Sequence, residues 1–139
     1  METRQTTPED FAKFLPLKES FVEEYRISKK SEEFIKKEFE NFLNKIFLLA
    51  IEDGEILGYL FGEIEESSYE KFGYLSEIFV KKETRRKGIA TALKDRFIKI
   101  LKEKGIEFCR VEVNPSNLAE QVYKSWGFNV DKHRMRLDL

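Results

Sequence analysis

The chain has 139 residues, of which 41% are hydrophobic and 13 are Phe, and this composition predicts a globular fold with a proper core rather than disorder. Its 25 basic and 26 acidic residues nearly cancel, which excludes a general attraction to nucleic acid or to an anionic membrane surface. A single cysteine excludes an intramolecular disulfide and favours a cytoplasmic setting, and no apolar run is long enough to cross a bilayer.

The first half of the chain predicts two helical regions and a hairpin. Pro8 suits the first turn of a helix, which we expect Pro16 to interrupt. Asp53-Gly54 is a typical two-residue hairpin turn. In chain order, the expected elements are an edge strand at 2–6, a helical region from Pro8, a helix with Ser31 as its N-cap, and two strands at 46–52 and 55–65.

The second half predicts alternating strands and helices. Apolar residues recur on one helical face between Ile89 and Leu101, and Gly105 ends that helix. The expected elements are a strand at 72–81, a helix at 88–104, a strand at 106–113, a helix at 117–126, and short strands near 127–130 and 133–138. This order implies right-handed crossovers within a sheet. We therefore expect one mixed α/β domain spanning residues 1–139.

The most informative segment is the basic loop between the strand that ends at Val80 and the helix that begins near Gly88. A helix N-terminus carries partial positive charge, so Arg85, Arg86 and Lys87 are unfavourable there unless an anion lies among them. Gly88 removes a side chain where an anion can approach the backbone N–H groups. The segment predicts a bound pyrophosphate; a solvated basic turn or a nucleic-acid patch are the alternatives.

Written as Arg85-x-x-Gly88-x-Ala90, this loop resembles the acyl-CoA signature of the GNAT superfamily of N-acetyltransferases. A second segment, with the spacing Ala119-x-x-x-Tyr123-x-x-x-Gly127-Phe128 after a strand and an Asn, resembles the family's second motif. The resemblance spans nearly the whole chain and is most specific in residues 75–93 and 111–128. It implies a mostly antiparallel sheet of about six or seven strands, flanked by four helices, with a splayed pair of central strands.

The resemblance also implies which residues bind acetyl-CoA, the expected co-substrate, with no metal. Backbone N–H groups of the basic loop would hold the pyrophosphate, and those at the end of the preceding strand would polarise the thioester carbonyl. Asn117 would bind the pantetheine amides, with Asn114 as second candidate because the interval from Asn117 to Tyr123 is one residue shorter than usual. The expected set is Ile78, Phe79, Val80, Arg85, Arg86, Lys87, Gly88, Ile89, Ala90, Thr91, Asn114, Asn117, Ala119 and Tyr123.

Two carboxylates are candidates for the general base. Strict strand alternation places Glu77 on one face with Leu75 and Phe79, and burial in that apolar row would raise its pKa. The resemblance points to Glu77, or to Glu112, which matches the catalytic Glu of ribosomal-protein N-terminal acetyltransferases. A water relay is the third possibility, and either Glu has a purely structural alternative as a partner of Arg110.

Tyr123 is the candidate general acid. It lies one helical turn beyond the small Ala119, and a phenol is suited to protonating a departing thiolate. The alternative is a core aromatic, but we expect the stripe of Leu118, Val122 and Trp126 to serve the core instead.

The acceptor is less defined by the sequence. Residues 20–32 and 63–72 are expected to line its entrance, and the second segment is acidic, which favours a cationic amine unless it is an ordinary solvated loop. We expect direct transfer of acetyl to a primary amine, because no activated Cys or Ser is evident. The rivals are a non-catalytic acyl-CoA sensor and a nucleic-acid-binding domain. The expected assembly is a monomer or homodimer with no nucleic-acid or membrane partner.

Overall fold

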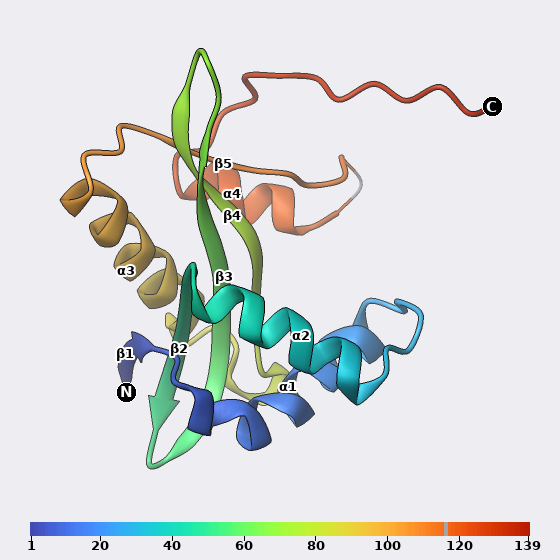
Figure 1. Ribbon diagram of the computed structural model, residues 1–139, viewed down its shortest axis with the longest axis vertical. Helices are drawn as coiled ribbons and strands as arrows, with labels where there is room; N and C mark the ends of the chain where they lie inside the picture. The colour runs from blue at the N-terminus through green and yellow to red at the C-terminus, as the bar shows by residue number, and fades with distance from the viewer. Residues whose placement is uncertain (116) are drawn as a thin grey trace.

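The computed structural model describes residues 1–115 and 117–139 (Figure 1). Its elements are β1 (Glu2–Gln5), α1 (Phe11–Glu24), α2 (Glu32–Leu43), β2 (Ile46–Glu52), β3 (Glu55–Glu66), β4 (Lys71–Val80), α3 (Ile89–Glu103), β5 (Cys109–Val111) and α4 (Ala119–Ser125), with short 3₁₀ turns at Pro8–Asp10 and Lys82–Thr84. The strands form one sheet in the order β1-β2-β3-β4-β5, antiparallel except for the parallel β4–β5 pair. The predicted fold class is confirmed.

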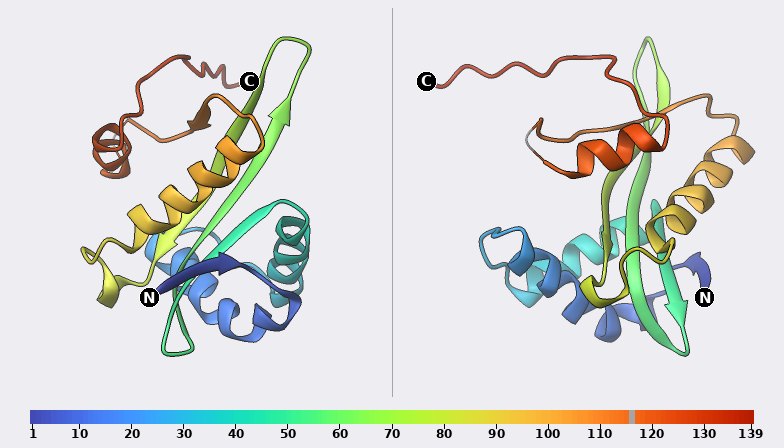
Figure 2. Two further views of the ribbon diagram at one scale, coloured as in Figure 1. Left: turned by 90° about the vertical axis from the view of Figure 1, so that its left-hand side faces the viewer. Right: turned by 180° about the vertical axis from the view of Figure 1, so that it is seen from behind.

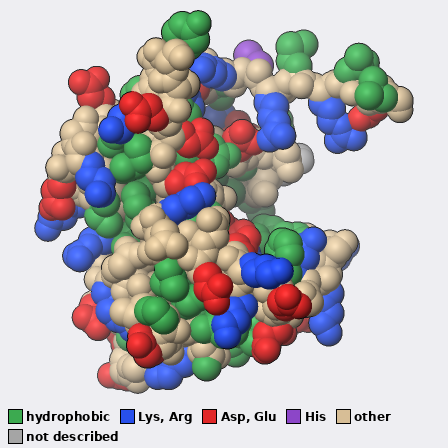
Figure 3. Space-filling view, viewed as in Figure 1, with side chains coloured by type: hydrophobic (Ala, Val, Ile, Leu, Met, Phe, Trp, Pro, Cys, Tyr) green, Lys and Arg blue, Asp and Glu red, His purple; other side chains and the backbone are tan. Residues whose placement is uncertain are grey.

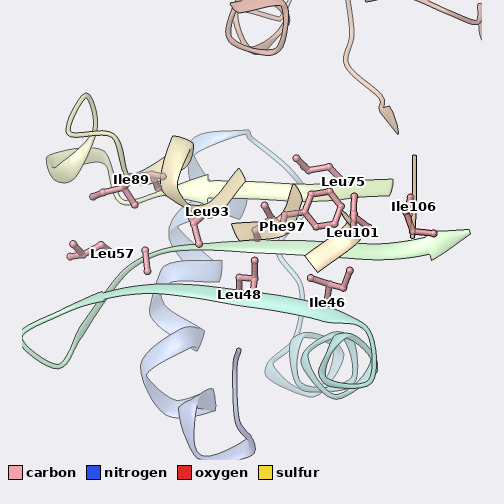
Figure 4. Close-up of a cluster of buried hydrophobic side chains, with 12 residues drawn as sticks. Ile46, Leu48, Leu57, Leu75, Ile89, Leu93, Phe97, Leu101 and Ile106 are labelled. Carbon is pink, nitrogen blue, oxygen red and sulfur yellow. The ribbon is translucent and has the colours of Figure 1, made fainter. Parts of the chain in front are cut away.

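The sheet lies between two helical layers. Helices α1 and α2 pack on one face and α3 on the other, as the left-hand view of Figure 2 shows. The core on the α3 face is aliphatic around Phe97 (Figure 4). The core on the α1/α2 face is rich in aromatic rings. Because β2 is buried on both faces from Ile46 to Ile51, it reads as a continuous apolar run rather than an alternating one.

The expected interruption of the first helix at Pro16 is wrong, because α1 continues from Phe11 to Glu24. A proline removes one backbone hydrogen bond, here the bond to the carbonyl four residues earlier, at Ala12. Both Ala12 and Pro16 are exposed, so water can satisfy that carbonyl. The opposite side of the helix buries Phe14 and Leu17, each worth about 1.5–3 kcal/mol, which offsets a proline cost of about 3 kcal/mol.

A β-bulge in β4 sets the direction of the side chains near the site. Pairing with β3 shifts between Gly62↔Leu75 and Phe61↔Glu77, so Ser76 is the extra residue. As a result Leu75 packs in the α3-side core, whereas Glu77 contacts α1. The expectation that Leu75 and Glu77 share a face is therefore wrong, since it assumed an uninterrupted strand.

Strands β4 and β5 part at the same point. Their pairing covers only Gly73↔Cys109, Tyr74↔Arg110 and Leu75↔Val111. From Ser76 to Val80, β4 pairs with β3 on one edge, and no described strand pairs with the other edge. This is the splayed pair of central strands that the sequence resemblance implied.

The C-terminal part departs from the expected strands. The expected strand at 106–113 is confined to Cys109–Val111, and the short strands near 127–130 and 133–138 do not form, so the sheet has five strands instead of six or seven. A hairpin between these two strands would need a tight turn at Asp131-Lys132. Such turns favour residues that readily adopt positive φ, and neither residue is a glycine or an asparagine. Residues 131–139 instead extend away from the body of the protein (Figures 1 and 2).

Candidate active site

The basic loop begins at the end of β4 and leads into the N-terminus of α3. Lys81 N–H donates to the Leu57 carbonyl at 2.8 Å, and the Thr84 hydroxyl donates to the Lys81 carbonyl at 2.8 Å. These bonds fix the start of the loop against β3. Arg86 and Gly88 both adopt left-handed backbone conformations, with φ of 64° and 79°. The chain therefore turns sharply twice just before the helix, a geometry that directs successive N–H groups outward.

Six consecutive backbone amides at this turn lack a hydrogen-bond partner among residues 1–115 and 117–139. They belong to residues 86–91, and the first main-chain bond after the turn is from Ala92 N–H to the Gly88 carbonyl at 3.0 Å. No side chain caps α3, and its first turn carries no acidic residue. Exposed N–H groups beside a positive helix end form an anion-binding site. This arrangement brings together Arg86, Lys87, Gly88, Ile89, Ala90 and Thr91.

Arg85 differs from its neighbours because its guanidinium is already engaged. Its Nε donates to the Val80 carbonyl at 2.9 Å, and Nη2 contacts both carboxylate oxygens of Glu24 at 2.7 and 2.8 Å. The guanidinium also lies 5.3 Å from the centre of the Phe79 ring. These contacts tie the loop to the end of α1 and leave Arg86 and Lys87 as the exposed cations at the turn.

The end of β4 presents main-chain groups along the open edge. Phe79 and Val80 are buried and Ile78 is half-buried. Phe79 packs on the α1/α2 side, whereas Ile78 packs against the α3-side core, so the two side chains anchor the strand in both layers. The backbone here is therefore held rigidly beside the gap that separates β4 from β5.

Glu77 lies at the centre of a buried polar network. It accepts a hydrogen bond from Tyr59 Oη at 2.5 Å and from Lys18 Nζ at 2.7 Å. Lys18, whose side chain is 5% exposed, also forms an ion pair with Glu38 at 2.9 Å. Burial raises the pKa of Glu77, and the charge and hydrogen bond of Lys18 partly oppose that rise. Burial and the Glu77 charge raise the pKa of Tyr59 well above its usual value, so the phenol stays a donor.

Glu112 has a different environment. It lies just beyond the end of β5, its side chain is 56% exposed, and it forms an ion pair with Arg134. Its charge helps to raise the pKa of Tyr74, after burial, which is the larger cause. Arg110 binds Glu70 and Asp131 rather than either candidate base. The structure thus buries Glu77 among partners and leaves Glu112 at the surface.

Tyr123 is half-buried on α4, with its ring 5.8 Å from Trp126 and 5.9 Å from Phe128 between centroids. Burial raises the pKa of Tyr123, and Tyr25 at the end of α1 contributes a smaller rise. Tyr25 in turn lies 6.4 Å from Phe79 between ring centroids. The ring contacts of Tyr123 are thus with Trp126 and Phe128, whereas Tyr25 packs beside the end of β4.

The expectation that Leu118, Val122 and Trp126 serve the core is wrong. Leu118 is 79% exposed and Val122 is 44% exposed, and α4 has no buried residue. Trp126 is half-buried beneath Lys94 of α3, whose Nζ lies 5.4 Å from the indole ring. Leu118 and Val122 therefore remain at the surface, and only Trp126 of the three is partly covered.

The two candidate asparagines flank the start of α4. The Asn117 side-chain oxygen accepts from Ala119 N–H at 2.8 Å, and Asn117 N–H donates to the Asn114 carbonyl at 2.9 Å. Asn117 therefore helps to start the helix and has only its side-chain NH₂ free for a ligand amide. Asn114 is exposed, and Ser116 within this motif lies outside the described residues.

Sequence reasoning missed Lys18, Tyr59 and Glu24 as partners of the site. The signal for Lys18 was its position: it lies on the face of α1 that buries Phe14 and Val22, where a lysine needs a buried anion. The partner of Arg85 had no such signal, because Glu24 is one of many acidic residues on exposed helix faces. Only the packing of α1 beside β4 brings the two together.

The acidic segment between β3 and β4 is partly neutralised by nearby cations. Lys45 binds Glu63 at 2.5 Å. Arg110 and, secondarily, Lys132 lower the pKa of Glu70 to about 2. Burial and the nearby Glu63 raise the pKa of Glu65. The negative charge available to a cationic acceptor is therefore smaller than the sequence indicates.

A groove of about 820 Å³ lies between α1, the β2–β3 hairpin and residues 81–83. Its wall includes Phe79 and Glu24 but neither Gly88 nor Tyr123. Acidic and basic side chains are mixed on the face that carries α1 and α2 (Figure 3). Within the described ranges, no helix is long and apolar enough to cross a membrane, and no cluster of three or more His, Cys, Asp and Glu side chains is arranged to bind a metal ion.

Comparisons with known proteins agree with this geometry. A family model described as "Acetyltransferase (GNAT) domain" matches residues 6–137. A solved structure described as a probable acetyltransferase is 26% identical, with a TM-score of 0.86 over 100% of this chain and 97% of that chain. A search of curated proteins found no match.

Two further solved structures share the fold at lower identity. The first is a ribosomal-protein-alanine N-acetyltransferase from Brucella melitensis biovar Abortus 2308, 19% identical with a TM-score of 0.81 over 100% of both chains. The second is an aminoglycoside antibiotic 6'-N-acetyltransferase from Acinetobacter haemolyticus, 21% identical with a TM-score of 0.81 over 100% of this chain and 98% of that chain.

Proposed function

Because the chain belongs to the GNAT acetyltransferase family and is an acetyl-CoA-dependent N-acetyltransferase, we propose that it transfers acetyl directly to a primary amine in a ternary complex. The row of unpartnered amides at residues 86–91 carries the proposal, because it lies directly after the end of β4, where the strand edge is open. No covalent enzyme intermediate is needed, and residues 1–139 act as one domain.

The residues at the start of α3 fit the CoA pyrophosphate. The six unpartnered N–H groups of residues 86–91 follow one another along this turn, and Arg86 and Lys87 add exposed positive charge. The pantetheine arm is a chain of amides, which suits the unpaired edge of β4 from Ser76 to Val80. Acetyl-CoA supplies the activated thioester. Among Ile78, Phe79 and Val80, the main-chain N–H groups that point to the open edge of β4 stabilise the oxyanion that develops on its carbonyl.

Glu77 is the general base of this proposal. A protonated amine cannot attack, and a carboxylate with a raised pKa is better matched to removing its proton than an ordinary one. Lys18 and Tyr59 orient that carboxylate from two sides. Glu112 is the less favoured base because it is exposed and paired with Arg134; a water relay is the remaining route.

Tyr123 protonates the departing thiolate, and Ala119 one turn earlier leaves room beside it. Asn117, through its free NH₂ group, and Asn114 bind the pantetheine amides. The acceptor class that we infer is a cationic amine: a polyamine, an aminoglycoside, a lysine or a peptide N-terminus. Two structurally similar proteins, described as an aminoglycoside and a ribosomal-protein-alanine acetyltransferase, support that range. The lone Cys109 is compatible with a cytoplasmic location.

Calorimetric titration with acetyl-CoA tests the binding site. We expect Gly88→Glu to abolish binding, because a carboxylate among the free amides repels the pyrophosphate. Gly105→Glu is the matched control, since Gly105 has φ of 75° at the other end of α3 and, like Gly88, has open space around it. It carries the same backbone strain and should bind normally. Equal loss in both variants, or no binding by the parent protein, would overturn the assigned site.

Thiol release from acetyl-CoA tests whether bound acetyl-CoA is used. With spermidine, sisomicin and a peptide with a free N-terminal alanine as acceptors, we expect turnover with at least one of them. Tyr123→Phe should lower kcat about 10²-fold while acetyl-CoA binding is unchanged. Tyr69→Phe is the control, because Tyr69 is 94% exposed. Tight binding with turnover insensitive to Tyr123→Phe would exclude Tyr123 as the acid, and binding without turnover would indicate a sensor.

A further inference from the structure

Four polar side chains from four elements meet between the two N-terminal helices and the sheet: Lys18 of α1, Glu38 of α2, Tyr59 of β3 and Glu77 of β4. The Lys18 ammonium lies 2.7 Å from Glu77 Oε2 and 2.9 Å from Glu38 Oε1. The Lys18 side chain is 5% exposed, whereas those of Glu77 and Glu38 are 19% and 27% exposed. Two carboxylates therefore compete for one buried positive charge.

Aromatic rings surround the ammonium on its other sides. Lys18 Nζ lies 4.7 Å from the ring centroid of Phe21, 5.2 Å from that of Phe61 and 5.9 Å from that of Tyr59. The faces of these rings attract a cation but do not replace a hydrogen-bond acceptor. Because the ammonium is almost fully shielded from water, its strong hydrogen bonds go to Glu77 or to Glu38.

The two contacts of Lys18 differ in geometry. Nζ donates a hydrogen bond to Glu77 Oε2, whereas its approach to Glu38 Oε1 is an ion pair without hydrogen-bond geometry. Within residues 1–115 and 117–139, Glu38 Oε1 is a buried oxygen that has no hydrogen-bond donor. Burying such an oxygen costs free energy, so it calls for an explanation. The ammonium is already within reach, and a small rotation of the Lys18 side chain would supply the missing bond.

The partners of Glu77 engage only one of its two oxygens. Lys18 and Tyr59 both donate to Oε2, and no described residue donates to Oε1. An acceptor amine would therefore transfer its proton to Oε1. Once protonated, Glu77 is neutral and holds the Lys18 ammonium less strongly, while Glu38 keeps its negative charge.

We propose that Lys18 shifts its hydrogen bond from Glu77 to Glu38 when Glu77 takes a proton from the acceptor, which makes Glu38 a positioning residue for the general base. In this step an N–H bond of the acceptor ammonium breaks and an O–H bond forms at Glu77 Oε1, while Lys18 stays an ammonium. Because Glu77 is the base only in the proposed function, this role of Glu38 rests on that function. The buried Glu38 oxygen without a donor is then the partner that awaits Lys18 in the second arrangement.

The charges around Glu77 agree in sign with this exchange. Burial raises the pKa of Glu77, Lys18 and then Tyr59 lower it, and the charge of Glu38 raises it. These groups face Glu77 from α1, β3 and α2, and Tyr25 acts only on Tyr59, as a minor contribution. Replacing Glu38 by Gln leaves the ammonium with one carboxylate, so Glu77 should hold its proton less tightly. Removing Lys18 should have the opposite effect.

Carbon NMR titration of the side-chain carboxyl groups tests the exchange without any substrate, with the Glu77 signal assigned by its loss in Glu77→Gln. We expect Glu38→Gln to lower the titration midpoint of Glu77 by about one pH unit. Glu38→Asp keeps the charge but shortens the side chain, and should lower the midpoint by less. Glu40→Gln is the matched control, because Glu40 is exposed on the same helix and forms no ion pair with a described residue. It should leave the midpoint unchanged.

The acid limb of kcat/KM, measured with an acceptor amine that turns over, should move to lower pH together with this midpoint. Thermal melting should show that the variants fold, since Glu38 is partly exposed. An unchanged midpoint in Glu38→Gln, or an equal shift in Glu40→Gln, would overturn the role of Glu38. So would an acid limb that disappears in Glu77→Gln but stays in place in Glu38→Gln. A midpoint that moves while Glu77→Gln keeps the parent pH profile would instead contradict Glu77 as the base, and thus the proposed function.

Discussion

Glu77 is unusual because its carboxylate is buried together with a cation rather than alone. Lys18 and Tyr59 both donate to it, and Lys18 also balances the charge of Glu38. Burial alone would favour the protonated acid, whereas Lys18 favours the carboxylate. The pKa of Glu77 therefore depends on the balance between burial, which raises it, and Lys18, which lowers it. Each partner of Glu77 can be removed by a separate substitution.

The pH dependence of turnover measures this balance. Glu77 accepts a proton only when ionised, so the rate falls as pH drops through its raised pKa. Lys18→Met removes the cation that opposes the rise, so the acid limb of kcat/KM should move to higher pH. Glu77→Gln should lower kcat about 10²-fold or more and remove that limb. The rate of the parent enzyme should also rise through the alkaline range as the acceptor amine loses its proton.

Lys37→Met is the control for loss of a lysine, because Lys37 is exposed on α2 and pairs only with Glu33. It should leave the profile unchanged. A profile that is flat from about pH 6 to 9 in the parent enzyme, or a Glu77→Gln variant with the parent profile, would exclude Glu77 as the base and leave Glu112 or a water relay.

Residue types and spacing were enough to propose the basic loop and Tyr123 as site residues, because a cationic turn before a helix and a Tyr one turn after a small residue are visible in the sequence alone. The partner of Arg85 was not visible, since its contact with Glu24 depends on how α1 packs beside β4. The expectation that Leu75 shares a face with Glu77 was wrong because one inserted residue, Ser76, reverses the alternation that sequence reasoning has to assume, whereas Phe79 does lie on the α1 side with Glu77.

At the scale of elements, α3 lies unusually close to the sheet over β3. A Cβ atom at Gly62 would stand 2.5 Å from Cε1 of Phe97, a ring that is fully buried. The ring sits in the middle of the α3-side core, among Leu93, Leu101 and Leu75 (Figure 4). Because Gly62 has no side chain, the Phe97 ring can lie between α3 and β3 without a steric clash.

Gly62→Ala should therefore destabilise the protein by about 1–3 kcal/mol, because the Phe97 ring has no free space into which it can move. Chemical denaturation would measure the change. Phe97→Leu alone should also destabilise, but the double variant should lose less than the sum of the two, since the smaller side chain makes room for the new methyl group. Strict additivity would show that the two residues do not contact as described.

The long elements were predictable because each has a strong period or a clear boundary signal, such as Ser31, which accepts from Phe34 N–H at 3.1 Å as an N-cap. Elements whose formation depends on pairing with a neighbouring element were not predictable from the sequence. The strands expected near 127–130 and 133–138 have the right pattern but no turn that returns them to their own sheet. The break predicted at Pro16 was wrong because the free-energy cost of a proline inside a helix was considered without the stabilising burial of Phe14 and Leu17.

At the scale of the molecule, two unequal parts emerge. Residues 1–106 form two cores on a shared sheet, whereas β5 pairs through only three residues and α4 buries none. Order of elements and fold class followed from the sequence because they depend on local patterns along the chain. The attachment of the last third did not, since it is set by the short β4–β5 pairing, the packing of Cys109 and Val111, and the ion pair of Arg110 with Glu70.

The bulge at Ser76 has a consequence for how this chain can vary. Without that one residue, Leu75 would still pair with Gly62 and Glu77 with Phe61, every side chain would keep its face, and the ladder between β3 and β4 would be uninterrupted. What the chain would lose is the bend that begins where β5 departs. Ser76 therefore marks the point at which the β3–β4 ladder is interrupted and the edge of β4 opens toward the gap beside β5.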